Sequence, residues 1–336
     1  MNIKTPSRLH MTLIDLNGSY GRSGGGIGLT LSDPYFSLKL EPSEKNITID
    51  FKKQYSDEIQ DECRRKIENS ANLIKEYFNL DTGFHFTVNN AYPPHSGLGS
   101  GSQTALATGK LMYDYAKENL LLSKEHENIS IVTLGEILKR GISSGIGIFA
   151  FENGGFIVDG GYNLKDKGSI LPSSGTYYKP PQFCSKFDFP EDWNIVLAIA
   201  NGDNTVTGVK EDILFAENCP VPRFEVEKLS HIIFMNLIPF LLEKNIEEFG
   251  KYINQIQDLG FKKVELGLQP PKIKNLMEKM KEFGAYGVGM SSFGPTLYGI
   301  TDKNTKEVYK STKEYLGDDG IVFVSKPQNY GYEKSD

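Results

Sequence analysis

Residues that mark disulfide scaffolds, zinc sites and membrane spans are scarce in this sequence. It has three cysteines in 336 residues, and none lies in a Cys-x-x-Cys pattern or a Cys/His cluster, so neither a disulfide framework nor a zinc site is expected. No apolar run approaches the roughly 18 residues of a membrane span, and the N-terminus does not resemble a secretion signal. We therefore expect a cytoplasmic protein that does not contact a membrane.

An excess of basic charge is also absent. The chain has 37 Lys and Arg against 43 Asp and Glu, a formal charge of -6, so we expect no nucleic-acid partner, although a local basic pocket for a small anion is allowed. The hydrophobic share of 39% is that of a folded globular protein, and 336 residues suffice for two domains. The expected partners are small molecules, and both a monomer and a homodimer stay open.

The pattern of apolar residues predicts an α+β chain. The N-terminal part is expected to form a meander of strands at 27–31, 36–40 and 47–51, a helix at 59–78, a strand at 84–88 and a helix at 103–115. A capping box, Thr133-x-x-Glu136, predicts a short helix, and strands are expected at 145–151 and 156–158. The segment 162–192 is rich in Pro, Gly, Ser and Lys, which places a domain boundary there.

The two predicted domains are residues 1–180 and 181–336. In the second, the pattern predicts strands at 195–200 and 321–325 and helices at 225–242, 246–259 and 273–283.

The loop that joins the strand at 84–88 to the next helix has an unusual density of glycine and serine. Three glycines in five positions let backbone N–H groups approach an anion, and the helix directs the positive end of its dipole to the same place. Serine hydroxyls can bond phosphoryl oxygens or a magnesium ion that the phosphate carries. The predicted phosphate-binding residues of this loop are Ser96, Gly97, Leu98, Gly99, Ser100, Gly101, Ser102 and Gln103.

This loop resembles the second motif of the galactokinase, homoserine kinase and mevalonate kinase (GHMP) superfamily. Segments 5–11 and 284–296 resemble the first and third motifs, in the same order along the chain. The resemblance implies a two-domain GHMP-kinase-like α+β fold, with a mixed N-terminal sheet that carries the phosphate loop and a ferredoxin-like C-terminal domain. It also implies that Ser291 and Ser292 of the third motif bind phosphate.

One departure from the kinase pattern narrows the resemblance. Kinases of this superfamily carry a Ser-Gly-x-Asp element whose aspartate accepts the proton of the substrate hydroxyl, whereas this chain reads Ser144-Gly145-Ile146-Gly147. The glycine is expected to leave open space beside the phosphate loop. Together with segments 7–18, 154–161 and 290–295, this element is similar to the branch of β-ribofuranosylaminobenzene 5'-phosphate synthases, which act in methanopterin biosynthesis.

That resemblance implies a decarboxylating ribosyl transfer from 5-phosphoribosyl 1-pyrophosphate, with Mg²⁺, to 4-hydroxybenzoate or 4-aminobenzoate. The alternatives are an ATP-dependent small-molecule kinase of the same superfamily and a catalytically silent ligand-binding relative. The residue types do not distinguish 4-hydroxybenzoate from 4-aminobenzoate as the acceptor, because the two compounds differ only in the group para to the carboxylate.

Several polar residues near these motifs are candidates for catalysis or binding. Each also has a structural alternative: an ion pair, a satisfied core histidine, a turn aspartate or a first-turn glutamate. The candidate catalytic residues are Arg8, His10, Asp15 and Glu211. Further binding candidates are Ser144, Gly145, Gly147 and Asp159, and the candidate metal ligands are Ser100 and Asp159.

Overall fold

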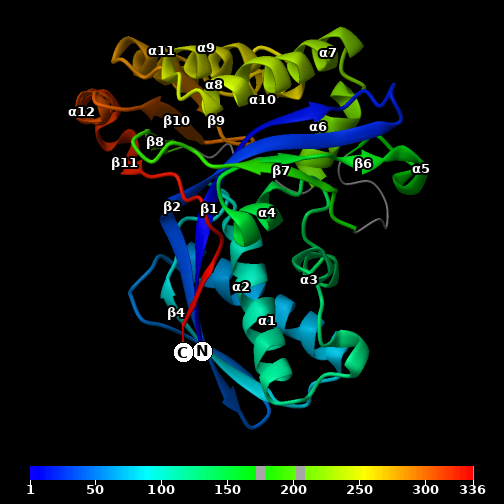
Figure 1. Cartoon of the computed structure of the whole chain (residues 1–336). Coiled ribbons are helices and arrows are strands. Elements are labelled where there is room, and N and C mark those ends of the chain that lie inside the picture. Colours follow the sequence, from blue (N-terminus) through cyan, green and yellow to red (C-terminus); the bar gives the residue numbers. More distant parts are fainter. Residues whose placement is uncertain (172–178, 202–208, 336) are drawn as a thin grey trace.

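The computed structural model describes residues 1–171, 179–201 and 209–335. Within these ranges the strands form one sheet of eight strands and one of four. Figure 1 shows the larger sheet beside helices α1 to α4 in the lower half of the molecule, and the smaller sheet below a layer of C-terminal helices. The two chain ends lie side by side, because the last strand pairs with the first.

Two long strands form the centre of the larger sheet. β1 (Asn2–Asp15) and β2 (Arg22–Ser43) make an antiparallel hairpin, and β2 also pairs with β4, β5 and β6, whereas β3 lies parallel to β4. The remaining strands of this sheet are β3 (Ile47–Phe51), β4 (Gly83–Asn90), β5 (Phe156–Asp159), β6 (Tyr162–Asn163), β7 (Phe183–Phe187) and β12 (Glu333–Ser335). β7 and β12 follow residue 180 in the chain and complete this sheet, and the division at residue 180 stays a prediction.

Helices of the first half cover the larger sheet with apolar faces. In α1, buried residues recur every three or four positions, and Asp57 and Glu58 occupy the first turn, where carboxylates favour the helix dipole. The predicted helices at 59–78 and 103–115 are confirmed. The helices of this half are α1 (Asp57–Phe78), α2 (Ser100–Glu118), a 3₁₀ turn (Lys124–His126), α3 (Ile131–Ile137), α4 (Ile146–Asn153) and α5 (Leu164–Lys167).

The smaller sheet is antiparallel throughout, in the order β11-β8-β10-β9. Its strands are β8 (Asn194–Ala200), β9 (Gly287–Met290), β10 (Thr296–Thr301) and β11 (Gly320–Ser325). The helices of this half are α6 (Val209–Asn218), α7 (Arg223–Ile232), α8 (Ile238–Leu242), α9 (Ile246–Ile256), α10 (Gly260–Gly267), α11 (Pro271–Glu282) and α12 (Thr305–Leu316). A π-helical stretch, Ile233–Leu237, joins α7 to α8, and a 3₁₀ turn, Gly317–Asp319, precedes β11.

The predicted meander at 27–51 is wrong in one respect. Residues 22–43 form a single strand, because the chain resumes its pairing with β1 after the turn-forming residues: Leu31 lies opposite Ser7 and Phe36 opposite Thr5. Residues 32–35 therefore bulge out of the strand without ending it.

Two predictions in the region after α2 are also wrong. Residues 145–151 are expected as a strand, but residues 146–153 form the helix α4 with Gly145 as its N-cap, because a short apolar run that is buried on all sides fits either structure. The N-cap of α3 is Ser130, whose hydroxyl accepts a bond from the Thr133 amide, so the capping box at Thr133 does not form.

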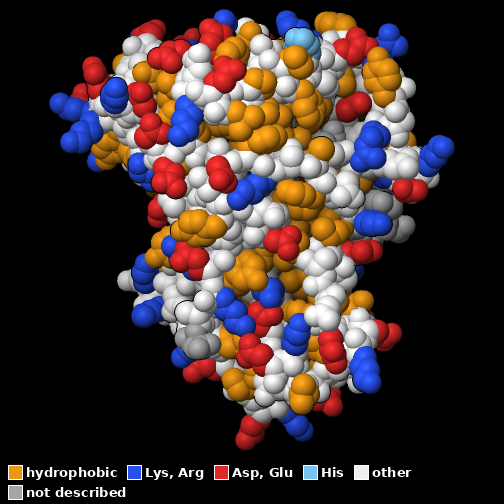
Figure 2. Space-filling model, viewed as in Figure 1, with side chains coloured by type: hydrophobic (Ala, Val, Ile, Leu, Met, Phe, Trp, Pro, Cys, Tyr) orange, Lys and Arg blue, Asp and Glu red, His pale blue; other side chains and the backbone are white. Residues whose placement is uncertain are grey.

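The surface mixes charges of both signs. On the face in Figure 2, Lys and Arg side chains are interspersed with Asp and Glu, and hydrophobic side chains gather over the C-terminal helices. Large exposed apolar residues of α7, α8 and the stretch between them include Phe224, Phe234, Met235 and Leu242. Among the described residues, no helix has the length and apolarity that crossing a membrane requires.

Candidate active site

The three sequence motifs, which are far apart along the chain, are joined by hydrogen bonds. The Arg8 amide donates to Leu98 O at 3.1 Å, and the Arg8 guanidinium donates to Gly97 O at 2.6 Å. From the third motif, the Ser291 hydroxyl donates to the same Gly97 carbonyl at 2.7 Å, and the Ser292 amide donates to His10 O at 2.9 Å. The phosphate loop is therefore held between β1 and the segment that links β9 to β10.

Two glycines of the loop have conformations that other residues rarely adopt. Gly97 and Gly99 both have φ of +84°, which favours glycine strongly. A Cβ at Gly97 would lie 2.5 Å from Ser291 O, and a Cβ at Gly99 would lie 3.1 Å from Arg8 Nε. Gly99 is the N-cap of α2, and no side chain caps this helix. The first amides of α2 thus form a candidate anion site.

The predicted loop residues divide into a scaffold and an open group. Ser96 and Leu98 are buried, and the Ser96 hydroxyl donates to Pro93 O. Gln103 is also buried and donates to Gly147 O at 2.9 Å. The buried side chains of Ser96, Leu98 and Gln103 therefore form a scaffold that holds the loop on its buried side. The residues left at the start of the helix, where an anion could bind, are Gly99, Ser100, Gly101 and Ser102.

Cationic side chains that the sequence motifs did not reveal lie at this helix start. Arg140, which follows α3, donates to the Ser102 hydroxyl at 3.0 Å. A Cβ at Gly101 would lie 3.4 Å from Lys66 Cε and 3.9 Å from Arg140 Nη2. Burial, together with the nearby Arg140, lowers the pKa of Arg8 to about 10. Neither Arg140 nor Lys66 belongs to a recognisable motif, so only the tertiary structure could identify them.

Glu211 is an acidic residue that interacts with the arginines of this cationic region. Burial, together with the nearby carboxylates of Glu265 and Asp212, raises its pKa to about 7, although Arg140 and Arg8 oppose the increase. A carboxyl group with such a pKa can accept and return a proton near neutral pH. Glu211 lies in the first turn of α6, and residues 202–208, which precede this helix, are outside the described ranges.

His10, Ser144 and Asp159 form a buried chain of hydrogen bonds. The Ser144 hydroxyl donates to Asp159 Oδ2 at 3.0 Å and lies 3.1 Å from His10 Nε2. Because that hydroxyl proton is used on Asp159, His10 Nε2 must be the donor of the second bond. Burial lowers the pKa of His10 well below its ordinary value, and Arg8 and Lys262 lower it further, so the ring is neutral at pH 7.

Asp159 is held by donors on both carboxylate oxygens. In addition to Ser144, it accepts from the amides of Gly145 and Gly161, both at 3.0 Å. Burial raises its pKa to about 6 in spite of these bonds. Both of its oxygens thus accept hydrogen bonds from Ser144, Gly145 and Gly161, and these bonds do not join Asp159 to Ser100. In the described part of the chain no three acidic, His or Cys side chains lie together in a way that could hold a metal, and the assignment of Ser100 and Asp159 as metal ligands stays a prediction.

The remaining candidates lie in different surroundings. Asp15 accepts from the amides of Asn17 and Gly18, both at 2.8 Å, in the turn that follows β1. At about 3.3 Å per residue it is roughly 20 Å along the strand from Arg8.

The space beside Gly147 is not open as expected, because a Cβ there would lie 3.2 Å from Ser102 Cβ. A side chain as large as aspartate at this position would displace Ser102.

Comparisons with known proteins agree with this geometry. The GHMP kinases N terminal domain model matches residues 65–155, and the GHMP kinases C terminal model matches residues 237–314. The mevalonate kinase of L. major superposes with a TM-score of 0.71 at 13% identity, covering 98% of this chain and 97% of that one. The predicted two-domain GHMP-like fold is confirmed.

Full-length relatives narrow the assignment. The Beta-ribofuranosylphenol 5'-phosphate synthase of Methanothermobacter thermautotrophicus is 43% identical over 98% of this chain and 97% of its own length. Its counterpart in Methanocaldococcus jannaschii is 40% identical over 99% of both chains. The predicted resemblance to this branch is confirmed, and the chain belongs to the beta-ribofuranosylphenol 5'-phosphate synthase family of the GHMP superfamily.

Proposed function

We propose that this protein is a decarboxylating ribosyltransferase that joins 5-phosphoribosyl 1-pyrophosphate to 4-hydroxybenzoate. The products are a β-ribofuranosylphenol 5'-phosphate, carbon dioxide and pyrophosphate, in methanopterin biosynthesis. The observation that carries the proposal is the cationic, glycine-lined start of α2 beside a carboxyl group whose pKa is about 7. The phenol in the names of the relatives favours 4-hydroxybenzoate over 4-aminobenzoate.

The phosphate loop is assigned to the diphosphate leaving group. Its support is the left-handed Gly99, the uncapped amides at Ser100 and Gly101, and Arg8 beside Gly99. As the bond between ribose C1 and the diphosphate oxygen breaks, negative charge builds on that oxygen, and fixed donors and a cation stabilise it. Ser291 and the buried loop residues keep these donors in place.

Glu211 is assigned to the proton of the acceptor hydroxyl. Its carboxylate removes this proton, which makes the ring carbon that bears the carboxyl group electron-rich. That carbon attacks ribose C1, and the C1–O bond to diphosphate breaks. Loss of carbon dioxide then leaves its bonding electron pair in the ring and restores the aromatic phenolate, which takes the proton back from Glu211. The positive charges of Arg8 and Arg140, which interact with Glu211, also favour the anionic phenolate electrostatically.

His10 and Asp159 are assigned to positioning. A neutral His10, held by Ser144 and Asp159, keeps β1 and Arg8 in place without adding charge to the site. Ser144 and the Gly145 amide belong to the same series of hydrogen bonds, and the Ser292 amide donates to the His10 carbonyl.

Other properties of the enzyme follow from the same proposal. Enzymes of the GHMP superfamily typically use Mg²⁺, and here the ion would arrive bound to the diphosphate, as part of the substrate. We place the enzyme in the cytoplasm, and a homodimer stays a prediction.

Release of labelled carbon dioxide tests the proposal. Wild-type protein is incubated with carboxyl-labelled 4-hydroxybenzoate, magnesium and 5-phosphoribosyl 1-pyrophosphate. We expect release that depends on the ribosyl donor and produces pyrophosphate in equal amount. Absence of release with either 4-hydroxybenzoate or 4-aminobenzoate would refute the transferase assignment. ADP formation from ATP that depends on a small alcohol would favour the kinase alternative.

A further inference from the structure

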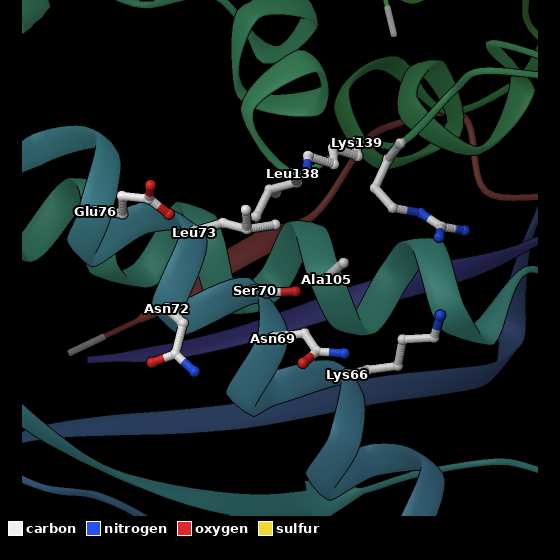
Figure 3. A pocket seen from close by; sticks show the side chains of 10 residues that line it. Lys66, Asn69, Ser70, Asn72, Leu73, Glu76, Ala105, Leu138 and Lys139 are labelled. Carbon is white, nitrogen blue, oxygen red and sulfur yellow. The ribbon is translucent and has the colours of Figure 1, made fainter. Parts of the chain in front are cut away.

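Lys66 and Arg140 form a group of cations separate from Arg8. Both lie against Gly101, in the first turn of α2, whereas Arg8 lies against Gly99 and the loop carbonyls. Lys66 comes from α1 and Arg140 from the segment after α3, so these two side chains reach the start of α2 from different elements. A Cβ at Gly101 would lie 3.9 Å from Lys66 Nζ and 3.9 Å from Arg140 Nη2, and Figure 3 shows the Lys66 side chain extending from α1 beside α2.

A cleft opens from this cationic pair. It has a volume of about 410 Å³ and runs between α1, α2 and the residues that follow α3. Lys66 lies at one end, where Arg140 also approaches Gly101, and the side-chain amides of Asn69 and Asn72 lie farther along α1. Cations bind phosphate and side-chain amides bind hydroxyl groups, so the cleft is polarised in a way that matches a phosphorylated sugar.

The charges at the cationic end are incompletely balanced. Glu62 lies 3.9 Å from Lys66 but also pairs with Arg65, and Arg140 Nε is buried without a hydrogen-bond partner among the described residues. The pKa values of Lys66 and Arg140 are both lowered, first by burial. Cations that repel one another in a partly buried place favour a bound anion.

We propose that Lys66 and Arg140 form a second phosphate subsite, which holds the 5-phosphate of the ribosyl donor while Arg8 and the loop hold its diphosphate. This inference rests on the proposed function, because it assigns the two ends of that donor to two places. When both phosphate-bearing ends of the ribosyl donor are bound, ribose C1 lies between the Lys66 and Arg140 pair and Arg8. This fixes the orientation of C1 toward the acceptor.

Calorimetric titrations of the full chain with two separate probes test the subsite. The probes are ribose 5-phosphate and inorganic pyrophosphate with magnesium, and the variants are Lys66→Met, Arg140→Gln and Arg140→Lys. We expect Lys66→Met and Arg140→Gln to weaken ribose 5-phosphate binding by about tenfold or more, the effect of losing a charge-assisted hydrogen bond. Pyrophosphate binding should stay within about twofold of wild type, and Arg140→Lys should restore part of the sugar phosphate affinity.

Lys139→Met is the matched control, because it removes the same charge from a side chain that lines the cleft but points away from Lys66. Both probes should bind this variant as they bind wild type. Unchanged ribose 5-phosphate affinity in Lys66→Met, or an equal loss of both probes, overturns the subsite. Thermal unfolding shows whether each variant is folded. If Arg140→Gln does not fold, the ribose 5-phosphate affinity of Lys66→Met alone tests the subsite. Wild-type protein that binds both probes through separate groups but releases no carbon dioxide would refute the function and leave the subsite intact.

Discussion

Replacing Glu211 by glutamine should stabilise the protein and inactivate it. The folded state holds this carboxyl group where burial and neighbouring carboxylates raise its pKa from 4.5 to about 7. The folded state therefore binds the proton more tightly than the unfolded state does, and ionising the group costs stability. This cost is absent below pH 4.5, grows as the pH rises toward 7 and is complete above pH 7.

The magnitude follows from the pKa difference. At about 1.4 kcal/mol per pKa unit, the increase from 4.5 to about 7 corresponds to roughly 3 kcal/mol, and partial exposure to solvent reduces this to about 1–3 kcal/mol. Glutamine has nearly the same shape and never ionises. We expect Glu211→Gln to raise the free energy of unfolding by about 1–3 kcal/mol at pH 8 and to change it little near pH 4.5.

Urea unfolding of both proteins at the two pH values measures this difference. Carbon dioxide release should fall by a factor of about 10² or more in the variant, as for loss of a general base, while wild-type kcat should decline as the pH falls below 7. A variant that is less stable than wild type at pH 8 would mean that the carboxylate forms a favourable ion pair with Arg8 or Arg140. Wild-type turnover in Glu211→Gln would remove the residue from proton transfer.

Other substitutions test the remaining parts of the site. Gly99→Val should raise the KM for 5-phosphoribosyl 1-pyrophosphate about tenfold or more, because its Cβ meets Arg8 at 3.1 Å and φ is +84°; an unchanged KM in steady-state kinetics would exclude the loop. Arg8→Lys should reduce kcat/KM by an amount equivalent to about 1.5–3 kcal/mol, and wild-type kcat/KM would make Arg8 structural. Gly147→Asp should yield no ADP from ATP with small alcohols, since the side chain collides with Ser102; alcohol-dependent ADP would contradict this. Ser144→Ala should lower the unfolding free energy by about 1–3 kcal/mol in urea, by removing a donor from buried Asp159, and equal stability would show that water replaces it.

Local chemistry made the phosphate loop predictable. The positive φ values of Gly97 and Gly99 require glycine, and the helix that follows has a regular apolar pattern, so both features are visible in a few adjacent residues. α1 was predictable for the same reason, with buried residues at steps of three and four. Short apolar runs carry less information, and the helix α4 was mistaken for a strand because burial on all sides removes the periodicity.

Contacts between distant segments were not predictable. Lys66 lies on a helix that looked merely amphipathic, and Arg140 follows a short helix with no motif, yet both reach the start of α2. Their roles depend on how α1 and the segment after α3 pack, which no local pattern encodes. Likewise, the link from His10 to Asp159 passes through Ser144, 134 residues away from His10.

The glycine at position 147 and Arg140 explain together how a kinase-like fold could support carbon–carbon bond formation. Transfer of phosphate to an alcohol calls for a base beside the phosphate loop, and in this chain Ser102, which accepts a bond from Arg140, occupies that space. A carboxyl group with a suitable pKa, Glu211, lies on a different element and interacts electrostatically with the same arginine. A base on a different element from the phosphate loop suits an acceptor whose acidic hydroxyl and attacking carbon lie at opposite ends of an aromatic ring. The position of the base, more than the phosphate loop itself, would then separate ribosyl transfer from phosphate transfer on this fold.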